Sequence, residues 1–339
     1  MSSVDDFLDN GDGGKRAKPK KRRWVLFTVI GVLAVALVGA VALAGFYGKS
    51  ALDALDAIKR EPSMTPTEGA TRPAPVPTKE GESEAPLNFV LMGSDTRGDE
   101  RGRSDVLQLL HIPGDRSGAY LMSIPRDTWV DIPGRGKAKI NAAYSFGGAG
   151  LTIETMEALL DVPMDHTVII DFEGFVRVID ALGGVTVNNR HASSSGGFNF
   201  PEGEIELTGD SALQYVRERK NLPAGDFSRG ERQRDVVMAV VKKIASAGTL
   251  ADPGKFRDVV TTLGPNFTVD EALTNDVIID LAMGMGTNAT NIHSFQFPVT
   301  GTGTSSDGQS IVLMDENKLG LLREALRADD LATYYEIQR

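Results

Sequence analysis

Charged side chains gather at the ends of three strand-like segments that follow one another in the chain. The apolar runs are Phe89–Met92, Val106–Ile112 and Tyr120–Ile124. Charges at the ends of adjacent strands mark the usual place of a ligand site in an open α/β sheet, although each could also be a solvated loop residue. The charged residues of this first cluster are Asp95, Arg97, Arg101, Arg103, Asp105, Arg126 and Asp127.

The residue types of the first cluster favour a cation beside a phosphate. Asp95 and Asp105 stand ten residues apart, and two carboxylates can share a hard cation such as Mg²⁺. The arginines between and after them suit a phosphate, because a planar guanidinium group matches the geometry of its oxygens.

A second charged cluster lies between Gln214 and Asp235. If Arg217 and Arg219 leave a helix in extended backbone, their side chains point the same way. Arg229 and Gln233 are one turn apart near the start of a predicted helix. Free N–H groups and the positive end of the helix dipole favour an anion there. Facing a Mg²⁺ ion held by the first cluster, these side chains predict a diphosphate site. Phosphoryl transfer at such a site needs little beyond positioning and charge neutralisation.

The same helix is predicted to run from Ser228 to Gly248. Ser228 and Glu231 form an S-x-x-E capping box, and Gly248 is the predicted stop. Arg232 and Arg234 are expected on its solvated face. Other predicted elements are a strand at His166–Phe172, helices at Thr152–Leu160 and Gly174–Leu182, an exposed polar loop at 190–206 and a late strand at Ile292–Phe297.

This order of strands and helices predicts an α/β fold with a mixed central sheet and helices on both faces. Residues 252–339 carry no motif of their own, and we expect them to complete the same sheet.

The N-terminal part of the chain predicts a membrane anchor. Seven basic residues lie in Lys15–Arg23, and Trp24–Gly48 then runs 25 residues without a charge. That length spans a hydrocarbon core of about 30 Å. The basic block places residues 1–23 in the cytoplasm and the rest outside. We expect a transmembrane helix at 24–48, a juxtamembrane helix and proline-rich linker at 49–86, and an extracytoplasmic catalytic domain at 87–339.

Composition narrows the possible partners. The chain has a net charge of −10 and no cysteine, so disulfides and thiolate metal sites are excluded. An acidic domain on the outer side of a membrane does not suit nucleic acid.

Seven motifs, in order, resemble the LytR-CpsA-Psr family. They are GSDTR, GRSD, IPRD, KINAAYSFGG, DFEGFVRVIDALGG, LTGDSALQYVRER and DFSRGERQ, and they cover roughly Leu87 to Leu250. The resemblance implies an α-β-α sandwich that binds a polyprenyl-pyrophosphate-linked glycopolymer and transfers its phosphate to peptidoglycan. The lipid would lie in an apolar tunnel within the sandwich.

The resemblance also implies roles for individual residues. Asp95 and Asp105 would hold Mg²⁺, and with Arg126 they would be the catalytic residues, Asp95 being the favoured general base. Asp127 is expected to be an ion-pair partner. The pyrophosphate would contact Arg103, Arg126, Lys139, Arg217, Arg219, Arg229 and Gln233. His111, His166, His191 and His293 show no metal-ligand spacing and are expected to be structural.

Two other functions remain open from the sequence. A pyrophosphatase would use the same residues and pass the phosphate to water. A non-enzymatic module would bind the lipid pyrophosphate without turnover, although the presence of both Asp95 and Asp105 disfavours it. The sequence does not identify the glycopolymer.

Overall fold

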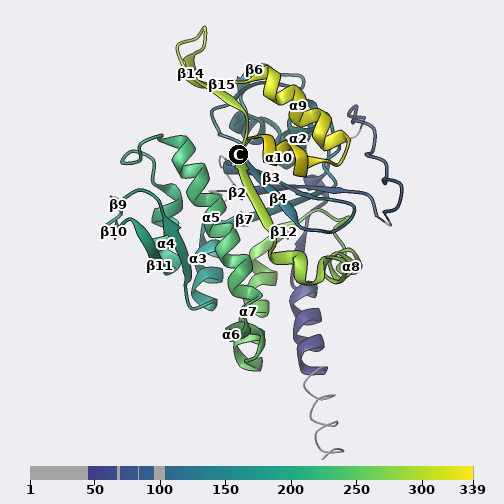
Figure 1. Cartoon of the computed structure of the whole chain (residues 1–339), viewed down its shortest axis with the longest axis vertical. Coiled ribbons are helices and arrows are strands. Elements are labelled where there is room, and N and C mark those ends of the chain that lie inside the picture. Colours follow the sequence, from purple (N-terminus) through teal and green to yellow (C-terminus); the bar gives the residue numbers. More distant parts are fainter. Residues whose placement is uncertain (1–44, 67–68, 83, 95–103, 339) are drawn as a thin grey trace, which may run out of the picture. The chain divides into compact units, whose positions relative to one another are not determined.

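A computed structural model gives the fold of the chain (Figure 1). It describes residues 45–66, 69–82, 84–94 and 104–338. The chain divides into two compact units, Met1–Phe46 and Tyr47–Arg339. The second unit contains every strand and helix discussed below, apart from the first two residues of helix 45–56.

A seven-stranded mixed sheet forms the centre of the second unit, as the sequence predicts. In spatial order the strands are β1 (Lys59–Arg60), β12 (Phe267–Val269), β7 (His166–Asp171), β2 (Leu87–Ser94), β3 (Ser104–Ile112), β4 (Ala119–Ser123) and β13 (Ile292–Gln296). The neighbouring pairs β1–β12, β7–β2 and β4–β13 are parallel, and the pairs β12–β7, β2–β3 and β3–β4 are antiparallel.

Helices cover both faces of this sheet (Figure 1). Alternate residues of a strand point to opposite faces. Val90 and Met92 therefore pack under α2 (Asn141–Leu160), α9 (Glu316–Arg327) and α10 (Leu331–Gln338), whereas Phe89 and Leu91 face the other way. The helices beyond that second face are α3 (Phe172–Ala181), α4 (Gly209–Arg217), α5 (Asp226–Ile244), α6 (Ala247–Leu250), α7 (Pro253–Asn266) and α8 (Asn275–Met285).

Short two-stranded sheets lie outside the central sheet. The predicted loop at 190–206 forms β9 (Ser193–Ser195), β10 (Phe198–Phe200) and most of β11 (Gly203–Leu207). β11 pairs with β8 (Val185–Asn189). The other hairpins are β5 (Trp129–Ile132) with β6 (Gly136–Lys139), and β14 (Val299–Thr304) with β15 (Ser310–Met314).

The boundaries of α5 differ from the prediction at both ends. α5 begins at Asp226, and its N-cap is Gly225 at φ +54°, a backbone conformation that glycine adopts at little cost. The prediction of a Ser228–Glu231 capping box is therefore wrong. Ser228 lies inside the helix, and its hydroxyl accepts from the N–H of Ala224. The helix ends at Ile244, so Gly248 is not its stop.

The second difference concerns α2. It starts at Asn141, well before the predicted Thr152, with a break at Gly148 (φ +68°) that separates its two halves. The glycine-rich sequence around that break obscures the helical periodicity of apolar residues, so the sequence does not predict the first half of α2.

The segment expected to be the end of a juxtamembrane helix and a proline-rich linker lies against the folded unit. Lys59–Arg60 pairs with β12 at one edge of the sheet, and Met64 is buried. Arg72 donates to the buried carboxylate of Glu157 at 2.5 Å. A proline-rich composition predicts an extended chain, but it does not prevent single anchor residues from binding to a surface.

The membrane anchor falls largely outside the described residues. Within the part of the chain that the structure describes, no helix combines the length and apolar character that crossing a membrane requires. The cytoplasmic tail and the helix at 24–48 remain predictions.

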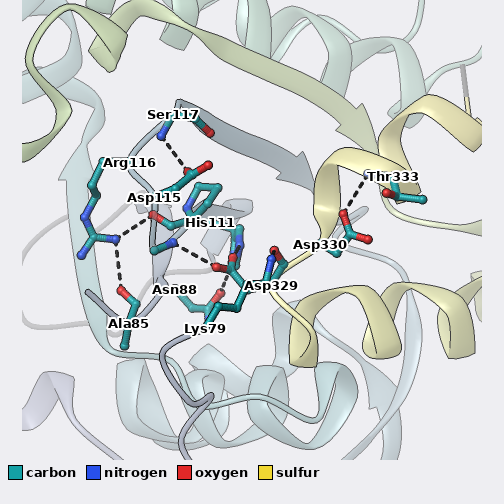
Figure 2. A network of polar contacts seen from close by, with 12 residues as sticks. Lys79, Ala85, Asn88, His111, Asp115, Arg116, Ser117, Asp329, Asp330 and Thr333 are labelled. Atoms are coloured by element: carbon teal, nitrogen blue, oxygen red, sulfur yellow. Dashed lines mark hydrogen bonds and ion pairs between the residues drawn. The ribbon is translucent and has the colours of Figure 1, made fainter. Parts of the chain in front are cut away.

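A buried polar network fixes the C-terminal helices to the sheet (Figure 2). His111 of β3 is fully buried, and its Nδ1 lies 2.8 Å from Oδ1 of Asn88 while its Nε2 lies 2.9 Å from Oδ1 of Asp329. The N–H of Gly114 donates to the other carboxylate oxygen, and Lys79 donates to the Asp329 carbonyl. Two strands and the segment before them thus converge on the turn between α9 and α10.

The Asp329→Asn variant tests this network. Burial alone would raise the pKa of Asp329, but the hydrogen bonds from His111 and Gly114 lower it. A lowered carboxyl pKa stabilises the fold above the unfolded pKa of about 4, and that contribution disappears as the pH falls through the folded pKa. We expect the variant to unfold with roughly 1–3 kcal/mol less free energy at pH 7.

The measurement is chemical unfolding at pH 7 and at decreasing pH, with Asp330→Asn at the neighbouring exposed position as control. The difference between wild type and Asp329→Asn should shrink as the pH falls. A difference that is absent at pH 7, or that grows in acid, would contradict the account.

Candidate functional site

The two predicted clusters meet at one basic cavity of about 490 Å³. Among the described residues, five cations and one carboxylate line it, in a chain of net charge −10. The lining residues are Val106, Arg126, Phe172, Ser194, Ser195, Val216, Arg217, Glu218, Arg219, Lys220, Asn221, Arg229 and Gln233. Arg126 of the first cluster therefore lies with Arg217, Arg219, Arg229 and Gln233 of the second.

Arg217 and Arg219 reach the basic cavity together because α4 ends between them. Arg217 is the last residue of α4, and Glu218 is extended at φ −61° and ψ 132°, so the two arginines line the same cavity as predicted. The Arg217 guanidinium lies 3.9 Å above the ring centroid of Phe172. This cation–π contact orients the charge of Arg217 at the cavity.

Glu218 organises the turn that carries Arg219. Its carboxylate is buried and accepts from the backbone N–H of Asn221 at 3.1 Å. Burial on its own would raise the pKa of Glu218, but hydrogen bonds from Asn221, Ser195 and the adjacent backbone lower it. Asn221 in turn donates to the carbonyl of Ser194 at 2.9 Å. The turn and the β9 strand therefore form one connected wall.

The first two turns of α5 supply the opposite wall. Arg229 pairs with Asp226, the first residue of the helix. Burial raises the pKa of Asp226, against the attraction of Arg229 and Arg126. Gln233 donates to the carbonyl of Val216 at 3.2 Å, which ties α5 to the end of α4.

Arg232 is buried, so the prediction of a solvated position is wrong for it. Its guanidinium lies 4.1 Å from the ring centroid of Tyr215 and donates to Asn189, His191 and Ser193 at 2.9–3.0 Å. These acceptors belong to the segment that leads into Ser194 and Ser195. Arg232 therefore stabilises the wall of the basic cavity that these two serines form, from the side that faces away from the cavity.

Arg234 is also buried, against the same prediction. It donates to Ser123 at the end of β4 and, at 3.1 Å, to Gln296 of β13. Burial lowers its pKa to about 10. A helix that packs on a sheet can bury residues outside its apolar stripe. Both arginines occupy such buried positions because hydrogen-bond acceptors lie within reach of their guanidinium groups.

Lys139 lies beside Arg126 without lining the cavity. It pairs with Asp127 at 3.1 Å, and Arg126 approaches the same carboxylate at 3.9 Å. Asp127 is therefore an ion-pair partner, as expected.

The metal prediction rests on residues outside this description. Asp95 and Arg103 fall outside the described residues, and Asp105 belongs to β3 without a described side chain. No group of three or more His, Cys, Asp and Glu that could hold a metal occurs among the residues that are described. Glu218 and Asp226 already bind N–H groups or a guanidinium. The fit of Mg²⁺ therefore depends on Asp95 and Asp105.

An apolar cavity of about 290 Å³ opens from the basic cavity. Val106, Phe172, Val216 and Gln233 line both. The apolar cavity lies between the second face of the sheet and α3, α5 and α7. Its other lining residues include Leu91, Val168, Ile170, Phe175, Val178, Ile179, Val236, Val237, Val240, Val241, Ile244, Leu263 and Phe267.

The family model described as the LytR_cpsA_psr family matches residues 51–328. The chain belongs to the LytR-CpsA-Psr family. The match extends beyond the region that the seven sequence motifs cover and includes most of the C-terminal part of the chain.

Curated relatives of this family member carry a transferase name. One from Halalkalibacterium halodurans, polyisoprenyl-teichoic acid–peptidoglycan teichoic acid transferase TagU, is 38% identical over 253 residues, or 73% of this chain and 80% of that protein. The protein of the same name from Bacillus cereus (strain AH820) is 36% identical over 281 residues, covering 83% and 89%.

Solved structures of related proteins share the fold of this LytR-CpsA-Psr chain. B. subtilis TagV matches with a TM-score of 0.63 at 29% identity, covering 73% of this chain and 98% of that one. A structure of TagT bound to LI-WTA matches with a TM-score of 0.60 at 27% identity, covering 78% and 98%.

The sequence does not predict eight of the described residues that line the basic cavity as site residues: Val106, Phe172, Ser194, Ser195, Val216, Glu218, Lys220 and Asn221. Phe172 lies within the quoted motif DFEGFVRVIDALGG, and Val216 and Glu218 lie within LTGDSALQYVRER, so a residue-by-residue reading of those motifs could have found them. Ser194 and Ser195 carry no signal, because they enter the site only through the fold of the β9–β10 hairpin.

Arg232→Lys tests how the wall at Ser194 and Ser195 is held. Lysine keeps the charge but loses the planar group that stacks on Tyr215 and reaches three acceptors. We expect a loss of roughly 1–3 kcal/mol in the free energy of unfolding and faster amide exchange at residues 189–195. Hydrogen exchange measured by mass spectrometry reports both the free energy of unfolding and the local exchange rates at residues 189–195. The matched control is Arg177→Lys, whose side chain is exposed; unchanged exchange at 189–195 in Arg232→Lys would contradict the assigned role.

Proposed function

We propose that this chain is a membrane-anchored phosphotransferase. It would move a glycopolymer phosphate from a polyprenyl-pyrophosphate carrier to peptidoglycan with the assistance of Mg²⁺. The observation that carries the proposal is the continuity of the basic cavity and the apolar cavity through four shared residues. A ligand that fills both must have an anionic head on an apolar chain, which is the character of a lipid pyrophosphate.

The names of the relatives support the same reaction class. The curated relatives are named as transferases that join a polyisoprenyl-linked teichoic acid to peptidoglycan. One related structure contains TagT bound to LI-WTA. We extend the transferase activity to this chain, with a glycopolymer of unspecified type as its cargo.

The transfer breaks one phosphoanhydride bond and forms one phosphoester bond. An acceptor hydroxyl of peptidoglycan attacks the phosphorus next to the glycopolymer, and polyprenyl monophosphate leaves. The acceptor proton passes to a base, for which Asp95 is the proposed residue. Arg217, Arg219 and Arg229 neutralise the charge that collects on the leaving phosphate.

Mg²⁺ is proposed at Asp95 and Asp105, where it would neutralise phosphate charge when bound. Arg126, at the end of the first cluster, would contact the oxygens on that side. Lys139 would contribute to the potential around Arg126 while its own ammonium group pairs with Asp127.

The proposed location follows from the N-terminal sequence. A transmembrane helix at 24–48, with the basic tail in the cytoplasm, would put the catalytic domain outside the membrane. Peptidoglycan and the lipid carrier meet there.

A transfer assay tests the reaction. The full chain in detergent is incubated with a polyprenyl-pyrophosphate-linked saccharide and Mg²⁺, with and without peptidoglycan fragments. We expect polyprenyl monophosphate and a saccharide phosphate attached to the glycan. Release of saccharide phosphate into water at a rate independent of the acceptor would establish a pyrophosphatase instead, and tight binding without turnover would establish a binding module.

Arg219→Ala tests the basic cavity. Loss of one charge-assisted contact costs on the order of 1.5–3 kcal/mol, or roughly ten- to a hundredfold in kcat/KM. The control is Arg257→Ala, which removes the same charge from an exposed position of α7. Equal rates for Arg219→Ala and wild type would remove Arg219 from the site.

A further inference from the structure

A second apolar depression, the distal groove, lies between α7, α8 and the helix at residues 45–56. Its volume is about 490 Å³, and none of the described residues that line it is charged. Ala51, Leu55, Val260, Ile279 and Met283 are among them, and Met283 is 68% exposed. The groove thus presents apolar side chains at a surface where a solvated domain would place polar ones.

The distal groove continues the apolar cavity. Leu263 and Phe267, at the end of α7 and the start of β12, line both. Neither side chain is fully buried, although both lie between helices and the sheet. Within the part of the chain that the structure describes, these two residues alone line both the apolar cavity and the distal groove.

The helix at 45–56 packs directly against α7 and forms one wall of the distal groove. A Cβ atom placed on Gly264 would lie 2.1 Å from the carbonyl oxygen of Ala54, so the two backbones are in direct contact there. In sequence, this helix begins within the last four residues of the uncharged stretch 24–48 that we propose as the membrane anchor.

We propose that the distal groove holds the far end of the polyprenyl chain. The inference rests on the proposed function and adds a binding site to it. The head group would occupy the basic cavity, the first isoprene units the apolar cavity, and the later units would pass Leu263 and Phe267 into the groove. The groove then makes the protein sensitive to the length of the lipid, because only a long chain reaches it.

Three substitutions by aspartate compare the groove, the cavity and a remote surface. Ile279→Asp puts a carboxylate into the distal groove, and Val240→Asp puts one into the apolar cavity. Ile337→Asp is the control, at a position of α10 that is 69% exposed. The full-chain variants are assayed in detergent, without a bilayer, on a long-chain polyprenyl-pyrophosphate saccharide and on its farnesyl analogue.

We expect Ile279→Asp to lower kcat/KM for the long-chain substrate by about tenfold, the order expected when one or two methylene groups lose an apolar environment. Its rate on the farnesyl analogue should equal that of wild type. Val240→Asp should lower both rates, and Ile337→Asp neither. Unchanged turnover of the farnesyl analogue also shows that Ile279→Asp is folded.

Equal effects of Ile279→Asp on the two substrates, or no effect on either, would overturn the proposal. The second result would also follow if the groove held only bilayer lipid or a second copy of the chain. Absence of turnover by wild type on both substrates would refute the proposed function itself, so the two failures are distinct.

Photo-crosslinking gives an independent readout. A long-chain substrate with a benzophenone at its terminal isoprene should label peptides of α8 or of residues 51–58 in wild type. Labelling confined to α3 and α5 would show that the chain ends inside the apolar cavity and would overturn the proposal.

Discussion

The cost of burying guanidinium groups at the start of α5 is the constraint on which the site depends. Arg229, Arg232 and Arg234 are each less than a tenth exposed, within two turns of one helix. A buried cation is tolerated only where charge or acceptors compensate its lost hydration. The compensating interactions differ among the three arginines. Arg229 forms an ion pair with Asp226, and Arg232 stacks on Tyr215 and donates to three oxygen acceptors. Arg234 donates to side chains at the ends of two strands.

Those compensating contacts determine the shape of the basic cavity. Arg232 and Arg234 point away from it and tie α5 to the β8–β9 segment and to the sheet, so Arg229 and Gln233 are left on the cavity side. The same helix then turns an apolar stripe of Val237, Val240 and Ile244 toward the sheet without closing on it. An anion-binding wall and a lipid-sized apolar space thus come from successive turns of one element.

Sequence patterns predict the mixed sheet, most of its strands and five of the described residues that line the basic cavity. The charged motifs succeeded because Arg217, Arg219, Arg229 and Gln233 are local to one stretch and their directions follow from helix and strand periods. Arg232 and Arg234 were misplaced because their burial depends on Asn189, Ser123 and Gln296, which lie far away in sequence. The start of α5 was misjudged because a glycine with positive φ replaces the side-chain cap, and the distal groove has no sequence signal at all.

The proposed function requires one amphiphile to occupy the basic and apolar cavities together. An experimental structure of the full chain with a polyprenyl-pyrophosphate-linked saccharide would test this occupancy directly. We expect diphosphate oxygens within about 3 Å of the Arg217, Arg219 and Arg229 guanidinium groups, and an isoprenoid chain between the sheet and α5. A diphosphate bound away from these arginines, or a lipid outside the space between sheet and helices, would contradict it.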